Sequence, residues 1–574
     1  MKYFTFTRLN PHALVISAAL VLSACGSDNN KSAAEVVATP VDAEDQQLTF
    51  DASDYTSLTV NIDGTDKAIR QYRIVYVANP IEMATTQSRF GQTITLEDPY
   101  VYQTMIISVP EASVEDQSTA IYFAVDNSGW FNSPVSTTIT DGAEFVSTSD
   151  TDNIGAALKA GYVVANVGTR SRGIRAADGH WAGKAPAPVV DSKAAIRYLR
   201  LNDAVMPGSA ERIVVNGTSG GGGLTSAVSA SGNSADYLPY LNAIGAAGIT
   251  GSGDKLSSTL NDDVFAAIAY CPINNLGNAD IGYEWQYNAV RSDSNTGAIN
   301  GVAYSAGVQP AASAEMASMF PTYLNNLNLK KDDGTAITDQ NLNDLLVGEL
   351  KAELERQIAA GVTVPNLGET FNVTQRGTTY SLTNNWLTLR GTGTTATVSN
   401  IDVEKFLAFV ASSINLKTVV AFDATAETGN PSVSGETNLF GSDYYEYGNF
   451  NAWTWTNNEV LGDGSGVDDT GLSWADYLAD TDSNNLAAQI NLINPINYLE
   501  TADADVAPHW YVRHGMVDRD TAFAMQLTLY YALKNNAKVE DVSFKIPYLV
   551  PHSGNYDVQE AFAWLKTTLA NNPL

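Results

Sequence analysis

A serine flanked by glycines is the residue in this chain best suited to nucleophilic chemistry. Ser219 lies in Gly-Thr-Ser-Gly-Gly at 217–221, which fits the Gly-x-Ser-x-Gly pattern of a nucleophile elbow. In that turn a strand passes abruptly into a helix, and glycines on both sides accept the close backbone contacts. The serine hydroxyl then stands exposed and attacks an electrophilic carbon once a neighbouring base has taken its proton.

The residues around Ser219 agree with a strand, a tight turn and a helix. Residues 213–215, Ile-Val-Val, are apolar and β-branched, as in a strand buried on both faces. The run 226–230 is small and compatible with a helix, whereas a flexible glycine linker lacks both flanks. A phosphate-binding loop would need a following Gly-Lys-Ser/Thr, which is absent. The Gly220 amide, at the start of the helix, is expected to stabilise an oxyanion.

Elimination among the five histidines selects a general base for this serine. His12 belongs to the N-terminal signal described below. His180 and His509 precede or begin strands, and His514 directly follows one. Only His552 lies on a loop after the last predicted strand. A base in that place matches the chain order Ser, Asp, His of the α/β-hydrolases.

The acid that orients the base should follow the strand before it. Asp518 does, and Asp520 is two residues further on. In an extended turn these two carboxylates point in different directions, so one can orient His552 while the other faces a substrate. Asp520 could also cap the helix that follows it. Asp541, before the final strand, and Asp557, too close in sequence to the histidine, are weaker candidates.

A second oxyanion donor is expected from the loop after the third strand of the main sheet. That loop contains Ser-Gly-Trp at 128–130, so the amide of Gly129 is the candidate, and the common His-Gly-Gly form is absent. Gly129 could instead serve only as a turn glycine.

The elements that must position these residues alternate between strand and helix. Apolar and alternating runs predict strands at 58–62, 72–77, 105–110, 120–125, 162–167, 213–215, 264–270, 510–513 and 543–549. Helical patterns lie around 156–158, at 191–201 and from about 558. This alternation predicts an α/β fold with a mostly parallel sheet covered on both faces. Ligands of such sheets lie at the carboxyl ends of the strands.

Residues 274–507 interrupt this alternation. They are rich in Tyr, Trp, Asn and Asp, with isolated helical patches such as 342–358, and they are too many for a simple connection. We therefore predict an α/β-hydrolase core at 46–273 and 508–574 and a large inserted lid at 274–507.

The N-terminus predicts export. Lys2 and Arg8 precede a short apolar run at 13–22, which is too short to span a bilayer. Leu-Ser-Ala-Cys at 22–25 is similar to the lipobox of bacterial lipoproteins, so residues 1–24 are predicted to be a signal peptide and Cys25 a lipidated cysteine. A plain secretory signal with Cys25 left free is the alternative. The polar stretch 25–45 is predicted to be a tether.

Charge and cysteine content exclude several partners. The net charge of −31 argues against nucleic acid and anionic membrane surfaces, so membrane contact is expected only through the N-terminal anchor. Only Cys271 follows Cys25, which excludes a disulfide within the folded body. No cofactor is expected. The acidic, glycine-rich stretch 462–469 could bind calcium, but its spacing does not match an EF-hand, and we expect a solvated loop and no metal.

Several motifs together indicate a family. The chain resembles the bacterial tannases of the lactobacillus type from about residue 48 to its end. The motifs that carry the resemblance are Tyr-Gln-Thr-Met at 102–105, Asn-Ser-Gly-Trp-Phe at 127–131, the glycine run 217–223, 236–241, Ala-Tyr-Cys-Pro-Ile at 269–273 with 283–285, 513–520, and Pro-His-Ser-Gly at 551–554.

The resemblance implies a catalytic triad of Ser219, Asp518 and His552, with the Gly129 and Gly220 amides as the oxyanion hole. It also implies that Asp520 binds a phenolic hydroxyl of a galloyl ester, which is a small-molecule substrate. A feruloyl or general carboxylesterase without gallate preference stays open, as does a non-catalytic surface-binding lipoprotein.

One part of the family pattern is missing at sequence level. The family adds a lysine and a glutamate from the lid to grip the galloyl hydroxyls. No lysine occurs between Lys417 and Lys534, and Glu436, Glu446 and Glu459 are the candidates for the glutamate. A site built for hydroxyl groups discriminates less when one of its polar partners is absent.

Overall fold

The computed structural model describes residues 43–574, except 90–91, 293–297, 300–301, 304–307, 425–434, 459–471 and 481–484. The predicted signal, Cys25 and nearly all of the tether lie outside the described residues, as does the acidic stretch 462–469. Residues 38–574 form one compact unit.

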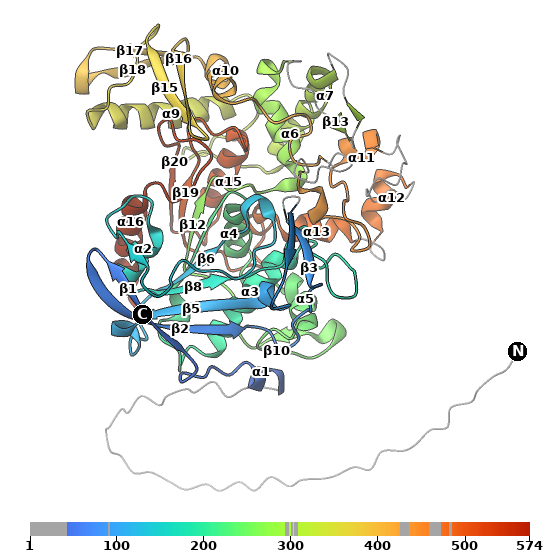
Figure 1. Ribbon diagram of the computed structural model, residues 1–574. Helices are drawn as coiled ribbons and strands as arrows, with labels where there is room; N and C mark the ends of the chain where they lie inside the picture. The colour runs from blue at the N-terminus through green and yellow to red at the C-terminus, as the bar shows by residue number, and fades with distance from the viewer. Residues whose placement is uncertain are drawn as a thin grey trace, which may run out of the picture. The chain divides into compact units, whose positions relative to one another are not determined.

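A ten-stranded sheet runs through this unit (Figure 1), in the order β20-β19-β12-β9-β6-β8-β5-β2-β1-β7. Its strands are β1 (Thr56–Ile62), β2 (Thr65–Val75), β5 (Thr104–Pro110), β6 (Ile121–Val125), β7 (Glu144–Phe145), β8 (Val163–Val167), β9 (Ile213–Thr218), β12 (Ala266–Tyr270), β19 (His509–Arg513) and β20 (Asp541–Lys545). Neighbouring strands from β20 to β8 are parallel, and β5, β2 and β1 continue the sheet antiparallel. The predicted α/β-hydrolase sheet is confirmed.

Helices cover both faces because alternate strand residues are apolar on both sides. Val214 packs into a cluster with α2 (Asn153–Lys159) and α16 (Val558–Asn571). Its neighbour Val215 packs into the opposite cluster with α3 (Ala187–Leu201), α4 (Gly220–Ala230) and α15 (Phe523–Asn535). The strand β9 that leads to Ser219 is therefore buried from both sides, which fixes its carboxyl end.

The long segment between β12 and β19 contributes no strand to the large sheet within its described residues. It forms α6 (Leu276–Tyr287), α7 (Val308–Ala317), α8 (Phe320–Asn326), α9 (Leu342–Ala359), α10 (Val403–Ser413), α11 (Ala452–Asn458), α12 (Trp474–Ala479), α13 (Leu486–Leu492) and α14 (Pro495–Leu499). Figure 1 draws α6, α7, α9 and α10 beyond the carboxyl ends of β12 and β19. The chain continues from β12 into α6 and from β19 into α15. Its function as a lid stays a prediction.

Antiparallel strand pairs in the described part of this segment go beyond the expected helical patches; the shortest pairs β13 (Ala298–Ile299) with β14 (Val302–Ala303). Longer ones pair β15 (Thr370–Gln375) with β16 (Thr378–Thr383) and β17 (Leu387–Arg390) with β18 (Thr397–Ile401). The β15 residues alternate between exposed and buried, with Phe371 and Val373 inward. This period of two was readable in Thr-Phe-Asn-Val-Thr-Gln, because a strand turns alternate side chains to one face.

The last predicted strand is shorter than expected. We predicted 543–549, and β20 ends at Lys545. Pro547 has no N–H to donate to a neighbouring strand, so pairing stops before it. Its carbonyl oxygen instead accepts the Met516 amide at 3.0 Å, which ties the loop after β20 to the loop after β19.

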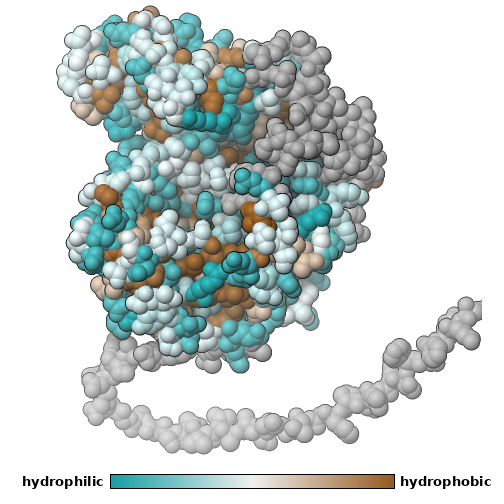
Figure 2. Space-filling view, in the orientation of Figure 1, coloured by the Kyte–Doolittle hydropathy of each residue, from teal (hydrophilic) through white to brown (hydrophobic). Residues whose placement is uncertain are grey.

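The surface agrees with the acidic composition. Figure 2 shows hydrophilic residues over most of the face in view, with hydrophobic ones in smaller areas between them. Among the described residues, none of the helices has the length and apolar character needed to cross a membrane.

Helix α4 packs against backbone rather than side chains at its first turns. A Cβ at Gly220 would lie 2.0 Å from the Trp130 nitrogen, and one at Gly223 would lie 2.0 Å from the Ile273 carbonyl oxygen. Both distances are far inside van der Waals contact. The glycine run therefore lets α4 approach the loops that follow β6 and β12.

We predict that Gly223→Ala destabilises the fold by about 1–3 kcal/mol, because the added methyl group must displace the Ile273 backbone. The matched control is Gly348→Ala in α9, where a Cβ meets nothing within 4 Å. That change should stabilise by about 0.5–1 kcal/mol through helix propensity. Urea unfolding of both variants checks this, and equal effects would contradict the close-contact argument.

Candidate active site

Ser219 occupies a strained turn between β9 and α4. Its φ is 61° and its ψ −122°, a region that L-residues rarely adopt. Its amide donates to the Tyr270 carbonyl oxygen at 2.9 Å, and its own carbonyl oxygen accepts the Ile273 amide at 3.0 Å. A Cβ at Gly217 would lie 2.3 Å from the Gly221 carbonyl oxygen, so the pattern's glycines are required. The predicted elbow geometry is present.

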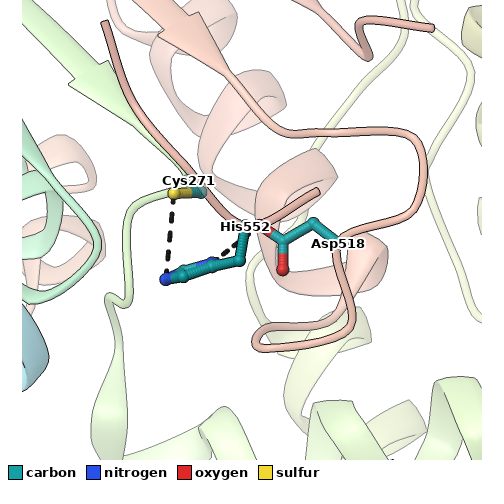
Figure 3. Close-up of side chains that lie close together, drawn as sticks. All are labelled: Cys271, Asp518 and His552. Atoms are coloured by element: carbon teal, nitrogen blue, oxygen red, sulfur yellow. Dashed lines mark hydrogen bonds and ion pairs between the residues drawn. The ribbon is translucent and has the colours of Figure 1, made fainter. Parts of the chain in front are cut away.

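The predicted acid, base and nucleophile meet at the carboxyl ends of three strands. His552, on the loop after β20, places Nε2 2.8 Å from the Ser219 Oγ. Its Nδ1 lies 2.8 Å from the Oδ2 of Asp518, which follows β19. Figure 3 shows the His552 ring with Asp518 on one side and Cys271 on the other. These contacts match the relay in which a carboxylate orients the imidazole and the imidazole accepts the hydroxyl proton.

The other described histidines make different contacts. His509 is in β19, where Nδ1 lies 2.5 Å from the Asp541 Oδ1. His180 lies at the surface beside Asp178. His514 is fully buried, and neither ring nitrogen has a hydrogen-bond partner among the described residues. None of these three replaces His552 as the neighbour of the serine.

The alternative acids are engaged elsewhere. Asp541 pairs with His509, and Asp557 accepts the hydroxyls of Tyr270 and Tyr511 at 2.7 Å. Asp520 lies close to the relay, with its Oδ2 4.0 Å from the His552 Nδ1. Its amide donates to the Asp518 Oδ1 at 2.8 Å.

Both predicted oxyanion glycines lie beside the elbow. Gly129 has a φ of 59°, and the next residue, Trp130, has a φ of 58°. The Trp130 amide donates to the Asn127 carbonyl oxygen at 2.8 Å, so it is not free for a ligand. Gly220 packs directly on Gly129 and Trp130. The two glycine amides are thus brought to one place, and their role stays a prediction.

Charge coupling sets the protonation of the relay. Burial alone would raise the pKa of Asp518, but the charge on His552, the neighbouring His514 and hydrogen bonds leave that pKa below its usual value. Burial also lowers the pKa of His552, and the Asp518 carboxylate outweighs this and raises it well above 6.5.

Two neighbours of the relay were not predicted from the sequence. His514 places Nδ1 3.5 Å from the Asp518 Oδ2, and burial lowers its pKa to about 4, so it is neutral at neutral pH. Cys271 directly follows β12, and its Sγ lies 4.0 Å from the His552 Nε2. The Cys271 sulfur, a His552 nitrogen and an Asp518 oxygen lie within 4.8 Å of one another. The position of Cys271 at the carboxyl end of β12 is the sequence signal that could have indicated it, because ligands lie at these strand ends.

Lys417, from the inserted segment, approaches the same region. Its amide donates to the Tyr283 hydroxyl at 3.1 Å, and that hydroxyl donates to the Arg519 carbonyl oxygen at 2.9 Å. One tyrosine oxygen therefore links Lys417 to the residue between Asp518 and Asp520. The Lys417 ammonium lies 4.0 Å from the centre of the Phe422 ring. In the sequence Lys417 only bounds a lysine-free stretch, and no role was predicted for it.

Glu436 contacts the backbone of Phe422. Its amide donates to the Phe422 carbonyl oxygen at 2.7 Å. The side chain is buried, and Oε2 has no hydrogen-bond partner among the described residues. Arg172, whose guanidinium stacks on Phe131 beside Gly129, lies near enough for Glu436 to favour its charge. Glu459 lies outside the described residues.

The sheet order, the elbow and the relay define an α/β-hydrolase with a large insertion. A solved tannin acyl hydrolase from Lactobacillus plantarum is 30% identical, with a TM-score of 0.68, over 91% of this chain and 99% of that chain. A tannase from Fusobacterium nucleatum is 29% identical, with a TM-score of 0.68 and the same coverages. A tannin acyl hydrolase in complex with ethyl gallate is 30% identical, with a TM-score of 0.67, over 91% and 99%.

A family model also matches part of the chain. The BD-FAE family model, which describes a feruloyl-esterase-like family, matches residues 140–242. Comparison with the curated proteins finds no match. The chain belongs to the bacterial tannase family and is an esterase-type hydrolase.

The coupled pKa values predict an acid limit to activity. Only neutral His552 can accept the Ser219 proton, so kcat/KM for an aromatic ester should fall as pH drops through the raised pKa, with a midpoint above 6.5. Asp518→Asn should lower that midpoint and reduce kcat by on the order of 10⁴-fold. A pH–rate profile measures both. Asp541→Asn, which removes a carboxylate paired with His509, is the control that should leave the midpoint unchanged.

Proposed function

We propose that this protein is an exported, lipid-anchored serine carboxylic ester hydrolase that cleaves aromatic, galloyl-type esters. The observation that supports this best is the pair of 2.8 Å contacts that join Ser219 to His552 and His552 to Asp518. A binding protein without catalysis has no need for this ordered relay beside a strained serine.

The proposed reaction proceeds through an acyl-enzyme. His552 takes the Ser219 proton as the serine oxygen attacks the ester carbonyl carbon. The amides of Gly129 and Gly220 hold the resulting oxyanion. The carbonyl re-forms, and the alcohol leaves with the proton from His552. Water, activated by the same histidine, then attacks the acyl-enzyme and releases the aromatic acid.

Three polar side chains support the substrate class, and Asp520 is the one that lies beside the relay. Asp520, Lys417 and Glu436 provide two carboxylates and an ammonium for the phenolic hydroxyls of a galloyl ring. The buried Glu436 Oε2 has no hydrogen-bond partner in the part of the chain that the structure describes, and a ligand hydroxyl that donates to a buried acceptor of this kind stabilises it. The relative solved with ethyl gallate supports this class. Two of the three residues come from 274–507, which we propose acts as a lid.

The alternative is a feruloyl or general carboxylesterase. The BD-FAE match at 140–242 favours it, because that stretch belongs to the core and contains Ser219. The two proposals share the relay and differ in the hydroxyl-binding groups.

Hydrolysis of methyl gallate, methyl ferulate and p-nitrophenyl acetate by the purified protein separates these proposals. We expect methyl gallate to have the highest kcat/KM, and Ser219→Ala to reduce every rate by on the order of 10⁴-fold or more. Equal use of all three esters would discard gallate preference and keep the serine esterase. Hydrolysis that survives Ser219→Ala, or no hydrolysis by the folded protein, would reject the proposed mechanism for these esters.

Two variants test the groups that we propose bind the phenolic hydroxyls. Asp520→Ala and Glu436→Gln should each lower the preference for gallate over acetate by about 10–100-fold, since each removes a charged hydrogen-bond partner. Glu404→Gln changes an exposed glutamate in the first turn of α10 and should leave the preference intact.

The anchor rests on the N-terminal sequence, outside the described residues. Cys25 follows a short apolar run in a lipobox-like setting, and a polar tether separates it from the compact unit. We propose that a bacterial membrane, the outer one or the cell surface, holds the protein through lipid on Cys25.

Cys25→Ser should move the protein from the membrane pellet to the soluble fraction, because the lipid attachment point is lost. Ser32→Ala, within the same tether, should leave it in the pellet. Fractionation of expressing cells followed by immunoblotting measures this, and an unchanged distribution would reject the anchor.

A further inference from the structure

A second side chain lies next to the catalytic nitrogen of His552. Cys271 Sγ is 4.0 Å from Nε2 and 3.3 Å from the carbonyl oxygen of Ser553, on the same loop (Figure 3). Cys271 is 1% exposed, whereas the His552 side chain is 21% exposed. The imidazole can therefore be reached from solvent. The Cys271 sulfur lies near Nε2, the ring nitrogen that contacts Ser219. Nothing in the proposed ester reaction uses this thiol.

The separation of sulfur and nitrogen suits a bridging cation. Zinc binds sulfur at about 2.3 Å and imidazole nitrogen at about 2.0 Å. A tetrahedral ion thus places the two ligand atoms about 3.5 Å apart. The 4.0 Å between Cys271 Sγ and His552 Nε2 is longer than this by about 0.5 Å. A small movement of either side chain closes this difference.

Asp518 already makes the contact that supports a metal-binding histidine. Histidines that bind metals through one ring nitrogen commonly donate the other N–H to a carboxylate, which fixes the ring and makes the free nitrogen more basic. The His552 Nδ1 lies 2.8 Å from the Asp518 Oδ2. The relay that prepares Nε2 to take a proton from Ser219 thus prepares it equally to bind a cation. Ser219 Oγ or water is close enough to complete the coordination.

We propose that Cys271 Sγ and His552 Nε2 form a site for a borderline-soft divalent cation, of the zinc and cadmium class, that switches the esterase off reversibly. The cation bonds to the lone pair of neutral Nε2 and to the sulfur; the thiol proton passes to water, and so does the ring proton where His552 is protonated. No electron is transferred. Ser219 then has no base. The inhibition rests on the proposed function, because it assumes that His552 is the base, whereas the binding does not.

Cadmium titration of the full chain tests the site. With Cys25→Ser, Cys271 is the only thiol. We expect one Cd²⁺ per chain, seen as a thiolate-to-cadmium charge-transfer band, with parallel loss of ester hydrolysis that EDTA restores. Cys271→Ser and Cys271→Ala should lack the band. Each should need at least about tenfold more Cd²⁺ for half-inhibition of its own metal-free rate. His552→Gln, which removes the other ligand, should weaken binding in a chain that keeps the thiol.

Ser219→Ala separates this inference from the proposed function, because it removes the nucleophile and keeps both ligand atoms. A band in Ser219→Ala supports the site whether or not the parent chain cleaves any ester. Ester hydrolysis without a band in the Cys25→Ser parent overturns the site and leaves the proposed function standing. Equal cadmium sensitivity of the parent and Cys271→Ala, with both shown to be folded by circular dichroism, also overturns it.

Discussion

The close approach of helix α4 to two loops is the constraint on which the site depends. At Gly220 and Gly223 the helix meets the backbone of the loops after β6 and β12 with no room for a Cβ. That contact brings the Gly129 and Gly220 amides together and leaves Ser219 in a turn with φ of 61°. The strain at Ser219 is offset by packing on both faces of β9, since a strained residue persists only where its surroundings hold it. The positions of the two candidate oxyanion glycines and of Ser219 are therefore products of one packing arrangement.

A buried carboxylate sets the electrostatics of the same region. Asp518 is fully buried and has two imidazoles near it, but these contribute differently. His514 has a pKa lowered to about 4 by burial, whereas the pKa of His552 is raised. Two protonated histidines around one carboxylate would leave an uncompensated buried charge, which is expensive. The environment thus directs the single proton to His552, the residue that faces Ser219.

Two other buried carboxyls hold separate parts of the inserted segment together. Asp280, in α6, accepts the amides of Phe422 and Asp423 at 2.8 and 3.0 Å. Asp423 in turn accepts the amides of Phe450 and Asn451 at 3.0 and 2.9 Å. Burial raises the pKa of Asp280 to about 7, and burial together with Asp280 raises that of Asp423. Satisfied hydrogen bonds of this kind are costly to break in a dry interior.

That anchor explains where the hydroxyl-binding candidates lie. Lys417 and Glu436 flank the anchored residue Asp423 in sequence, and both contact Phe422. Fixing Phe422 against α6 therefore places the residue that Lys417 contacts through its ammonium and Glu436 through its backbone amide. Tyr283, from the same helix α6, adds a link from Lys417 to the loop of Asp520.

The sequence was enough for the core because its signals are local or follow chain order. Apolar runs indicate buried strands. The order Ser219, Asp518, His552 follows from the fold once the strands are identified. The inserted segment has no such order. Nothing near Lys417 in the sequence points to Arg519, because the link between their backbones is made by one tyrosine hydroxyl.

Cys271 shows a different limit of sequence reasoning. Its position directly after β12 puts it at the carboxyl edge of the sheet, where ligands gather. Its distance from His552 depends on how the loop after β20 folds back, and that loop begins where Pro547 ends the strand pairing. A hydrogen bond from the Met516 amide to the Pro547 carbonyl oxygen sets its path. Tertiary contacts between two loops thus determine which groups lie near the His552 Nε2. Neither loop has a sequence pattern that indicates this contact.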